Sequence, residues 1–440
     1  MKKRFVITLT ALLLIGILLC TVACSKVSPT TDETSNYATA QQTVDAAIAV
    51  ASAEAVDYTF RTGTEEDQAV QNRAGDADKY VICDNGQTQS LVYIYEDICY
   101  DESKSYRYFD VLTPVAKEQL DPNTPVLLYL HGGGWVSGDR KADEVSLLPY
   151  LAKAGNVVIT MEYALWFGFN QREEADKGVY SWAGANVFDI IGSIIECKTP
   201  VSIGDQQADI DACLTYLRNT YLPSLGLKAT SIGIGGYSAG AHLTSLYAYG
   251  KGDQSPIRLA YLMNMAGPVY MLNETYMYWA ELMTGRSKEN PEAAQDILDL
   301  VQPVLTESAK ALAGLLGASN PIDVTTDEGY QQAIDGTAKV QPIDYVKSDS
   351  LPTILCYAKQ HDESFDFLET LFNGDYDDFI PVSVYYAIEQ KLTNMGVVHS
   401  NAIFDNLTHL TISTATESCK WIASRVAAYA SVYCKPTRAQ

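Results

Sequence analysis

The sequence lacks the patterns that mark several common metal and cofactor sites. It has no G-x-x-x-x-G-K-[ST] loop and no H-E-x-x-H pair, and none of its nine cysteines forms a C-x-x-C motif. Gly233 and Gly235 would begin a dinucleotide fingerprint, but the third glycine position is Ser238. Histidine is scarce as well, at five residues, with no clustered His/Cys ligand set. We therefore expect neither a metal nor an organic cofactor.

Basic residues are few relative to acidic ones. Lys and Arg number 31 against 54 Asp and Glu, and the formal net charge is −23. So acidic a chain favours solubility and disfavours binding to nucleic acid, to anionic membranes or to polyanionic substrates. No nucleic-acid partner is expected, and the expected partner is a small molecule.

A long apolar run is also missing, although a short one lies near the N-terminus. Lys2-Lys3-Arg4 precede an apolar stretch from Phe5 to Leu19, which is too short to span a membrane comfortably. Thr21-Val22-Ala23-Cys24 then resembles a bacterial lipobox, with Thr21 where leucine is usual. That resemblance implies a signal peptide over 1–23 and a lipid on Cys24. The protein would then be anchored on the outer face of a cell membrane by this lipid alone; a plain secretory signal is the alternative.

Cysteine pairing stays open. Cys83–Cys99 and Cys419–Cys434 are the local candidates in an exported chain, and the odd number remaining after cleavage leaves at least one thiol without an intramolecular partner.

Hydrophobic patterning indicates one large α/β domain over 56–440, after a tether and an N-terminal helix within 24–55. The tether is the Ser/Thr/Asp-rich stretch from Ser25 to about Asn36, and the alanine-rich residues 41–55 are compatible with a helix of unclear role. Strands are predicted at Leu91–Tyr95, Tyr106–Leu112, Val126–Leu130, Val157–Met161, Ser231–Gly235, Leu259–Met263 and Thr353–Tyr357, and a helix at Asp209–Leu222. Alternation of strands and helices predicts a doubly wound, mostly parallel sheet.

Two stretches exceed what such a core needs. The first, about 166–204, is rich in aromatic residues, and the second, about 269–341, is largely helix-compatible. Segments that follow the carboxyl ends of parallel strands lie beside the ligand crevice. We expect both stretches to form a cap over the site, with many of their aromatic side chains serving only to pack it onto the core.

Two glycine-rich motifs indicate the type of reaction. The first, His131-Gly132-Gly133-Gly134-Trp135, directly follows the apolar run Val126–Leu130. The second, Gly236-Tyr237-Ser238-Ala239-Gly240, lies between a strand-like run and a helix-compatible stretch from Ala241. A strand, a sharp turn with small residues around a serine, and a helix make a nucleophile elbow, and a glycine run can present backbone N–H groups to a developing oxyanion.

Together these motifs resemble those of the α/β-hydrolase superfamily, in its serine carboxylesterase branches with an HGGG oxyanion loop. Those branches are the hormone-sensitive-lipase-like esterases and the bacterial feruloyl or acetyl-xylan esterase-like proteins; Trp135 after the glycines favours the second. The resemblance implies Ser238 as nucleophile and an oxyanion hole from the N–H groups of Gly133, Gly134 and Ala239. Trp135 and Tyr237 are candidate substrate-lining residues, although Trp135 could instead anchor the loop.

The base and the acid of a triad must follow Ser238 in the chain. His409, in Asn406-Leu407-Thr408-His409-Leu410, matches where the family places its base, whereas His399 lies at the start of the preceding strand. The family places its acid in a loop resembling D-x-x-V-P, which Asp377-Asp378-Phe379-Ile380-Pro381 fits with Asp377 as the acid. Because the strand at Thr353–Tyr357 ends well before it, Asp362 remains the alternative.

Two other histidines have less direct roles. His131 is expected to brace its loop, and His242 to cap or pack.

These residues predict an exported serine carboxylesterase that forms an acyl-enzyme on Ser238 and acts on short-chain or carbohydrate-linked acyl esters. The substrate class rests on the family resemblance alone. A serine peptidase of the same fold and a catalytically silent α/β-hydrolase acting as a surface binding protein are the alternatives.

Overall fold

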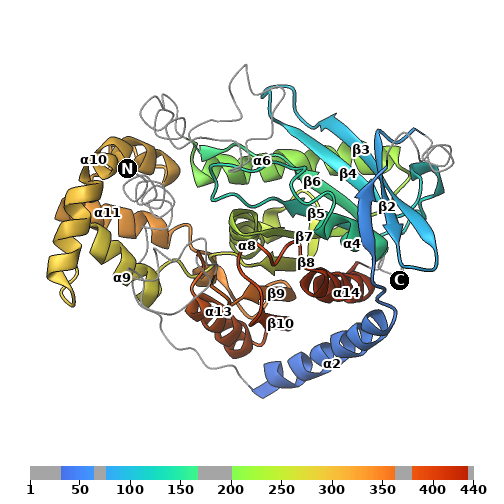
Figure 1. Cartoon of the computed structure of the whole chain (residues 1–440). Coiled ribbons are helices and arrows are strands. Elements are labelled where there is room, and N and C mark those ends of the chain that lie inside the picture. Colours follow the sequence, from blue (N-terminus) through green and yellow to red (C-terminus); the bar gives the residue numbers. More distant parts are fainter. Residues whose placement is uncertain (1–30, 64–75, 167–200, 362–378, 435–440) are drawn as a thin grey trace.

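A computed structural model describes residues 31–63, 76–166, 201–361 and 379–434. Within these ranges ten strands form one twisted sheet, in the order β1-β2-β3-β4-β6-β5-β7-β8-β9-β10 (Figure 1). The strands are β1 (Thr59–Thr62), β2 (Lys79–Asp84), β3 (Gln89–Cys99), β4 (Tyr108–Thr113), β5 (Val126–Leu130), β6 (Val157–Met161), β7 (Ser231–Tyr237), β8 (Arg258–Met265), β9 (Thr353–Ala358) and β10 (His399–Phe404).

The sheet has a parallel half and an antiparallel half. The run β6-β5-β7-β8-β9-β10 is parallel throughout, whereas β1 to β4 pair antiparallel with their neighbours, including β4 with β6. The predicted doubly wound, mostly parallel sheet is thus confirmed for the half that carries the glycine motifs. The antiparallel extension was not predicted, because strand-like runs in a sequence do not reveal their direction.

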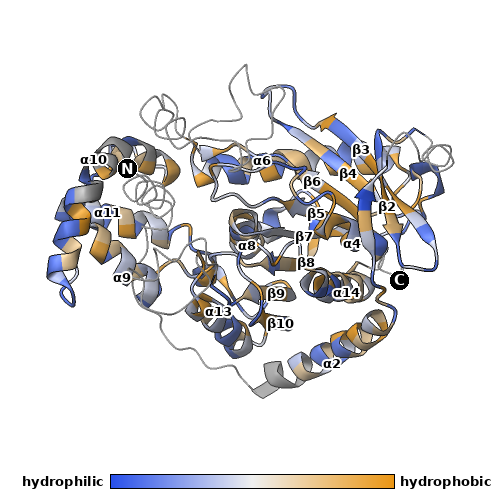
Figure 2. Ribbon diagram, viewed as in Figure 1, coloured by the Kyte–Doolittle hydropathy of each residue, from blue (hydrophilic) through white to orange (hydrophobic). Residues whose placement is uncertain are grey.

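The central strands are apolar and fully covered. Every residue of β5 and β6 is buried, as expected for strands packed on both faces, and the centre of the sheet is coloured as largely apolar (Figure 2). Against the sheet, α6 (Ile203–Tyr216) packs beside α8 (Ala239–Lys251), and α4 (Leu147–Lys153) packs beside α14 (Thr416–Tyr433). Helix α13 (Val382–Met395) contacts β9 and β10, and the short α7 (Leu222–Ser224) follows α6.

The N-terminal helix is part of the folded domain. Helix α2 (Thr31–Ala53) begins inside the stretch predicted as a tether and packs along α14. The side-chain amide of Gln41 donates to the carbonyl of His399 (3.0 Å) and accepts from its N–H (3.1 Å), so α2 occupies hydrogen-bonding groups at the edge strand β10. This contact supplies the role that the sequence left unclear.

The second insertion is helical in the structure. It contains α9 (Glu274–Met283), α10 (Pro291–Leu315) and α11 (Asp327–Ala338), which group together at one side of the molecule, away from β1–β3 (Figure 1). Most of the first insertion, 167–200, lies outside the described residues, as do the predicted signal peptide and Cys24. No helix in the described ranges is long and apolar enough to cross a membrane.

The described cysteines form no disulfide with one another. Cys83, Cys99, Cys419 and Cys434 are free thiols, so the two local pairings considered from the sequence do not occur.

Candidate active site

Ser238 lies at the sharp turn between β7 and α8. Its backbone has φ 52° and ψ −120°, a left-handed conformation that is uncommon for a residue with a side chain. The flanking glycines are required by space: a Cβ on Gly236 or Gly240 would lie 2.6 or 2.1 Å from the carbonyl oxygen of Leu130. The turn therefore presses against the end of β5 and projects the serine from the carboxyl edge of the sheet.

His409 is brought to Ser238 from a distant part of the chain. Its Nε2 is 3.0 Å from Ser238 Oγ, and the residue is 4% exposed in the loop between β10 and α14. The Tyr237 hydroxyl donates to the His409 carbonyl (2.5 Å), and the rings of Tyr237 and Phe379 lie 5.3 and 5.1 Å from the imidazole. The imidazole is thus held within hydrogen-bonding reach of a serine hydroxyl, the geometry that a general base needs.

The glycine loop after β5 runs beside the serine. A Cβ on Gly132 would lie 3.1 Å from the Ser238 Cβ, and the loop turns through Gly133 (φ 123°) and Gly134 (φ 60°), two conformations that favour glycine. Gly133 and Gly134 are only partly buried. Ala239 is the first residue of α8, so its N–H has no acceptor within the helix. These three N–H groups lie on the two segments that flank Ser238; their role as an oxyanion hole stays a prediction.

His131 braces this loop. Its Nδ1 is 2.7 Å from the Gly132 carbonyl, and its ring stacks on Tyr163, whose hydroxyl donates to the His131 carbonyl (3.0 Å). Burial acts to lower the pKa of His131, but the Glu162 carboxylate, 3.5 Å from Nε2, outweighs it and leaves the pKa raised. A protonated ring can donate to the Gly132 carbonyl, which agrees with the bracing role expected from the sequence.

Trp135 and Tyr237 are both engaged by the protein itself. The Trp135 indole is 3% exposed, and its Nε1 donates to His242 Nδ1 (3.2 Å), as an anchoring residue would do. The hydroxyl of Tyr237 is bound to the His409 carbonyl, although its ring is only partly buried. Their part in lining a substrate site stays a prediction, and sequence reasoning missed the contact each makes, because neither partner is near in the chain.

Both candidates for the acid, Asp377 and Asp362, lie outside the described residues. The described residues on either side of this gap both reach the histidine loop. The Gln360 N–H donates to the Leu407 carbonyl (2.9 Å), and Phe379 contacts the His409 ring. Asp377 as the acid, with Asp362 as its alternative, therefore stays a prediction.

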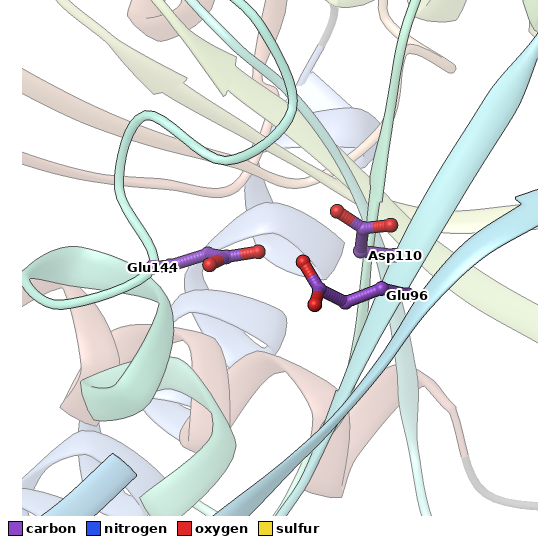
Figure 3. Close-up of side chains that lie close together, drawn as sticks. All are labelled: Glu96, Asp110 and Glu144. Atoms are coloured by element: carbon purple, nitrogen blue, oxygen red, sulfur yellow. The ribbon is translucent and has the colours of Figure 1, made fainter. Parts of the chain in front are cut away.

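A cluster of carboxylates lies apart from the serine. Glu96, Asp110 and Glu144 point toward one another (Figure 3), with one oxygen of each within 4.8 Å of the others. Burial and the charge of Asp110 raise the pKa of Glu144 to about 7. Cations already neutralise the group: Glu96 pairs with Lys79 and Lys141, Asp110 with Arg140 (3.0 Å), and Glu144 approaches Lys79 (3.9 Å). The cluster is part of an ion-pair network with these three cations.

Comparison with known proteins gives a family match that includes the elbow. Residues 197–367, less than half of the chain, match the model of the BD-FAE family, an α/β-hydrolase family. The matched stretch contains Ser238 and excludes both the HGGGW loop and His409. No curated protein matches the chain.

Several solved structures have a similar arrangement at low identity. Esterase B from Lactobacillus rhamnosis is 16% identical, with 82% of this chain and 90% of that chain covered and a TM-score of 0.46. A truncated carbohydrate esterase from gut microbiota is 14% identical (77% and 96% covered, TM-score 0.48), and an esterase from the archaeon Pyrobaculum calidifontis is 14% identical (90% and 93% covered, TM-score 0.44). Likeness at this level carries no information about substrate.

The family match supports the predicted resemblance to α/β-hydrolase carboxylesterases. The described residues form a mostly parallel central sheet flanked by helices. Residues 197–367, which include the strand–serine–helix turn, are similar to the BD-FAE family of α/β-hydrolases.

Proposed function

We propose that the protein is a serine carboxylesterase that cleaves acyl esters through an acyl-enzyme on Ser238. The observation that supports this most directly is the 3.0 Å contact between His409 Nε2 and Ser238 Oγ at a strained strand-to-helix turn. A serine hydroxyl is a weak nucleophile until a positioned base removes its proton, and this contact supplies the base.

The reaction proceeds in two acyl transfers. Ser238 Oγ attacks the ester carbonyl carbon while its proton passes to His409 Nε2, and the carbonyl oxygen becomes an oxyanion facing the N–H groups of Gly133, Gly134 and Ala239. The intermediate collapses, and the leaving alkoxide takes the proton from His409. Water then attacks the acyl-enzyme, His409 accepts its proton and returns one to Ser238 Oγ, and a carboxylic acid leaves.

The substrate and the location belong to the same proposal. The acidic surface and the resemblance to feruloyl and acetyl-xylan esterase-like proteins favour neutral, short-chain or carbohydrate-linked acyl esters. The N-terminal pattern favours export and a lipid on Cys24. Incorporation of a labelled fatty acid by the full-length chain, and its loss in Cys24→Ala, tests the anchor separately from the chemistry.

Hydrolysis of p-nitrophenyl esters of increasing chain length tests the activity. We expect turnover of the acetyl and butyryl esters by the wild type, and loss of turnover in Ser238→Ala and His409→Gln. Equal turnover by Ser238→Ala would overturn the proposal. Inactivity of the wild type on all esters, together with its activity on a peptide or its binding of a carbohydrate, would favour the peptidase or the silent binding protein.

The same assay decides the acid. We expect Asp377→Asn to lower kcat strongly and Asp362→Asn to lower it little; the reverse order would assign the acid to Asp362.

A further inference from the structure

His242 is a buried histidine that the proposed reaction does not use. It lies one turn along α8 from Ser238, has no exposed surface, and both of its ring nitrogens are bound. Nδ1 is 3.2 Å from Trp135 Nε1, and Nε2 is 2.8 Å from the Val340 carbonyl oxygen. An indole N–H only donates and a carbonyl only accepts, so the ring must be neutral with its proton on Nε2.

The Trp135 end of this bridge lies on the predicted oxyanion loop. Trp135 follows Gly133 and Gly134 directly and has φ 64°, a left-handed conformation that is uncommon for a bulky residue. Such a conformation persists only where surrounding contacts hold it. Two contacts do so: the indole bond to His242, with the two rings edge to face at 5.2 Å, and the Trp166 N–H, which donates to the Trp135 carbonyl (2.7 Å).

The Val340 end lies in the stem of the second insertion, by which we mean residues 269–272 and 340–343 at its two ends. The two sides of this stem are joined where the Ile343 N–H donates to the Val269 carbonyl (3.0 Å) and the Leu272 N–H donates to Gln341 Oε1 (3.0 Å). The Val340 carbonyl, which accepts the hydrogen bond from His242 Nε2–H, is therefore held in place by these two contacts. His242 connects that stem to the loop beside Ser238 through side-chain contacts that lie outside the reacting atoms.

We propose that His242 is a positioning residue for ester hydrolysis, which holds the oxyanion loop in its working conformation by bridging Trp135 to the insertion stem. This inference rests on the proposed esterase function. A small displacement of catalytic groups by a change away from the chemistry can lower a rate about a hundredfold, so the bridge has a measurable consequence for kcat. A residue that only filled the core would affect stability and leave the rate of each folded molecule unchanged.

Three substitutions separate the two ends of the bridge. In His242→Asn the amide oxygen can replace Nδ1 as the acceptor for Trp135, and in His242→Gln the amide N–H can replace Nε2 as the donor to Val340. His242→Leu removes both contacts. His399→Asn is the matched control, because His399 lies on β10 and contacts the Val397 carbonyl (2.8 Å).

The rates are measured per active site, with the sites counted by fluorophosphonate titration. We expect His242→Gln and His242→Leu to lower kcat about tenfold or more with KM changed by less than about threefold, and His242→Asn to restore most of kcat. Trp135→Phe should resemble His242→Gln, and the Trp135→Phe/His242→Leu double variant should lose no more than the worse single variant, because both break one contact.

Equal kcat per titrated site in all His242 variants, with only lowered thermal stability, would overturn the inference. Additive losses in the double variant would do so as well, and so would a nitrogen-15 NMR spectrum of the wild type that shows the His242 proton on Nδ1. Failure of the proposed function is distinct from these results, because it appears in the wild type as absence of both titration and turnover.

Discussion

The buried, neutral state of His242 makes the stability of the protein depend on pH. Burial lowers the pKa of His242 from the ordinary 6.5 to about 4. His242 therefore becomes protonated below about pH 6.5 in the unfolded chain, but only below about pH 4 in the folded protein. The free energy of unfolding must fall as the pH falls from 6.5 to about 4. The stabilising contribution of neutral His242 is fully present only above pH 6.5.

The magnitude follows from the size of the shift. Each pKa unit is worth about 1.4 kcal/mol, so the difference between 6.5 and about 4 corresponds to about 3 kcal/mol over the whole window, and to about 2 kcal/mol between pH 7 and pH 4.5. The residue has no exposed surface, so solvent screening does not reduce this figure.

Urea unfolding of the wild type and of His242→Gln at pH 7, 5.5 and 4.5 measures this contribution, because the other titrating groups are common to both proteins. We expect the wild type to lose about 2 kcal/mol more than the variant between pH 7 and pH 4.5. A constant difference between the wild type and His242→Gln at all three pH values would refute the reasoning.

Three further substitutions test the packing of the fold. Gly240→Ala should lower the free energy of unfolding by about 1–3 kcal/mol or more, because its Cβ would lie 2.1 Å from the Leu130 carbonyl oxygen; thermal unfolding measures the change, and an unchanged melting temperature would contradict that contact. Ser238→Gly should be more stable than the equally inactive Ser238→Ala, because glycine adopts φ 52° without the strain of about 1–3 kcal/mol; calorimetry that ranks them in the opposite order would argue against a strained turn. Gln41→Ala should lower the free energy of unfolding by about 1–3 kcal/mol and speed hydrogen exchange of the His399 amide, because the side chain of Gln41 accepts from this N–H. An unchanged exchange rate in the variant would contradict the contact between α2 and β10.

The buried strands could be predicted from the sequence because their signal is local. Val126–Leu130 and Val157–Met161 are continuous apolar runs, and β5 and β6 have these bounds. Helix α6 was predicted at Asp209–Leu222 but begins at Ile203, where Ser202 and Asp205 form a capping box that the apolar spacing does not register.

The positions of Ser238 and His409 could be predicted from a sequence motif and from the order of elements along the chain, not from apolar patterning. The small residues around the serine have a steric cause, and the structure shows it in the approach of Gly236 and Gly240 to Leu130. The position of His409 after the last strand predicts it as the base, and the fold brings it to the serine hydroxyl.

The contacts that support these residues could not be predicted. The bridge from Trp135 through His242 to Val340 joins segments about a hundred residues apart, and the bond from Tyr237 to the His409 carbonyl joins the end of β7 to the loop before α14. Neither has a spacing or composition that marks it, because side-chain partners across a fold are set by the tertiary packing. The direction of strands β1 to β4 is hidden for the same reason.

The central claim is that Ser238 is a nucleophile activated by His409. Reaction of the protein with a fluorophosphonate, followed by mass spectrometry of the intact chain and of its peptides, tests it most directly. We expect one adduct for each chain, located on the peptide that contains Ser238, with no adduct in Ser238→Ala and much slower labelling in His409→Gln. Absence of labelling in the folded wild type, or an adduct on another residue, would contradict the account.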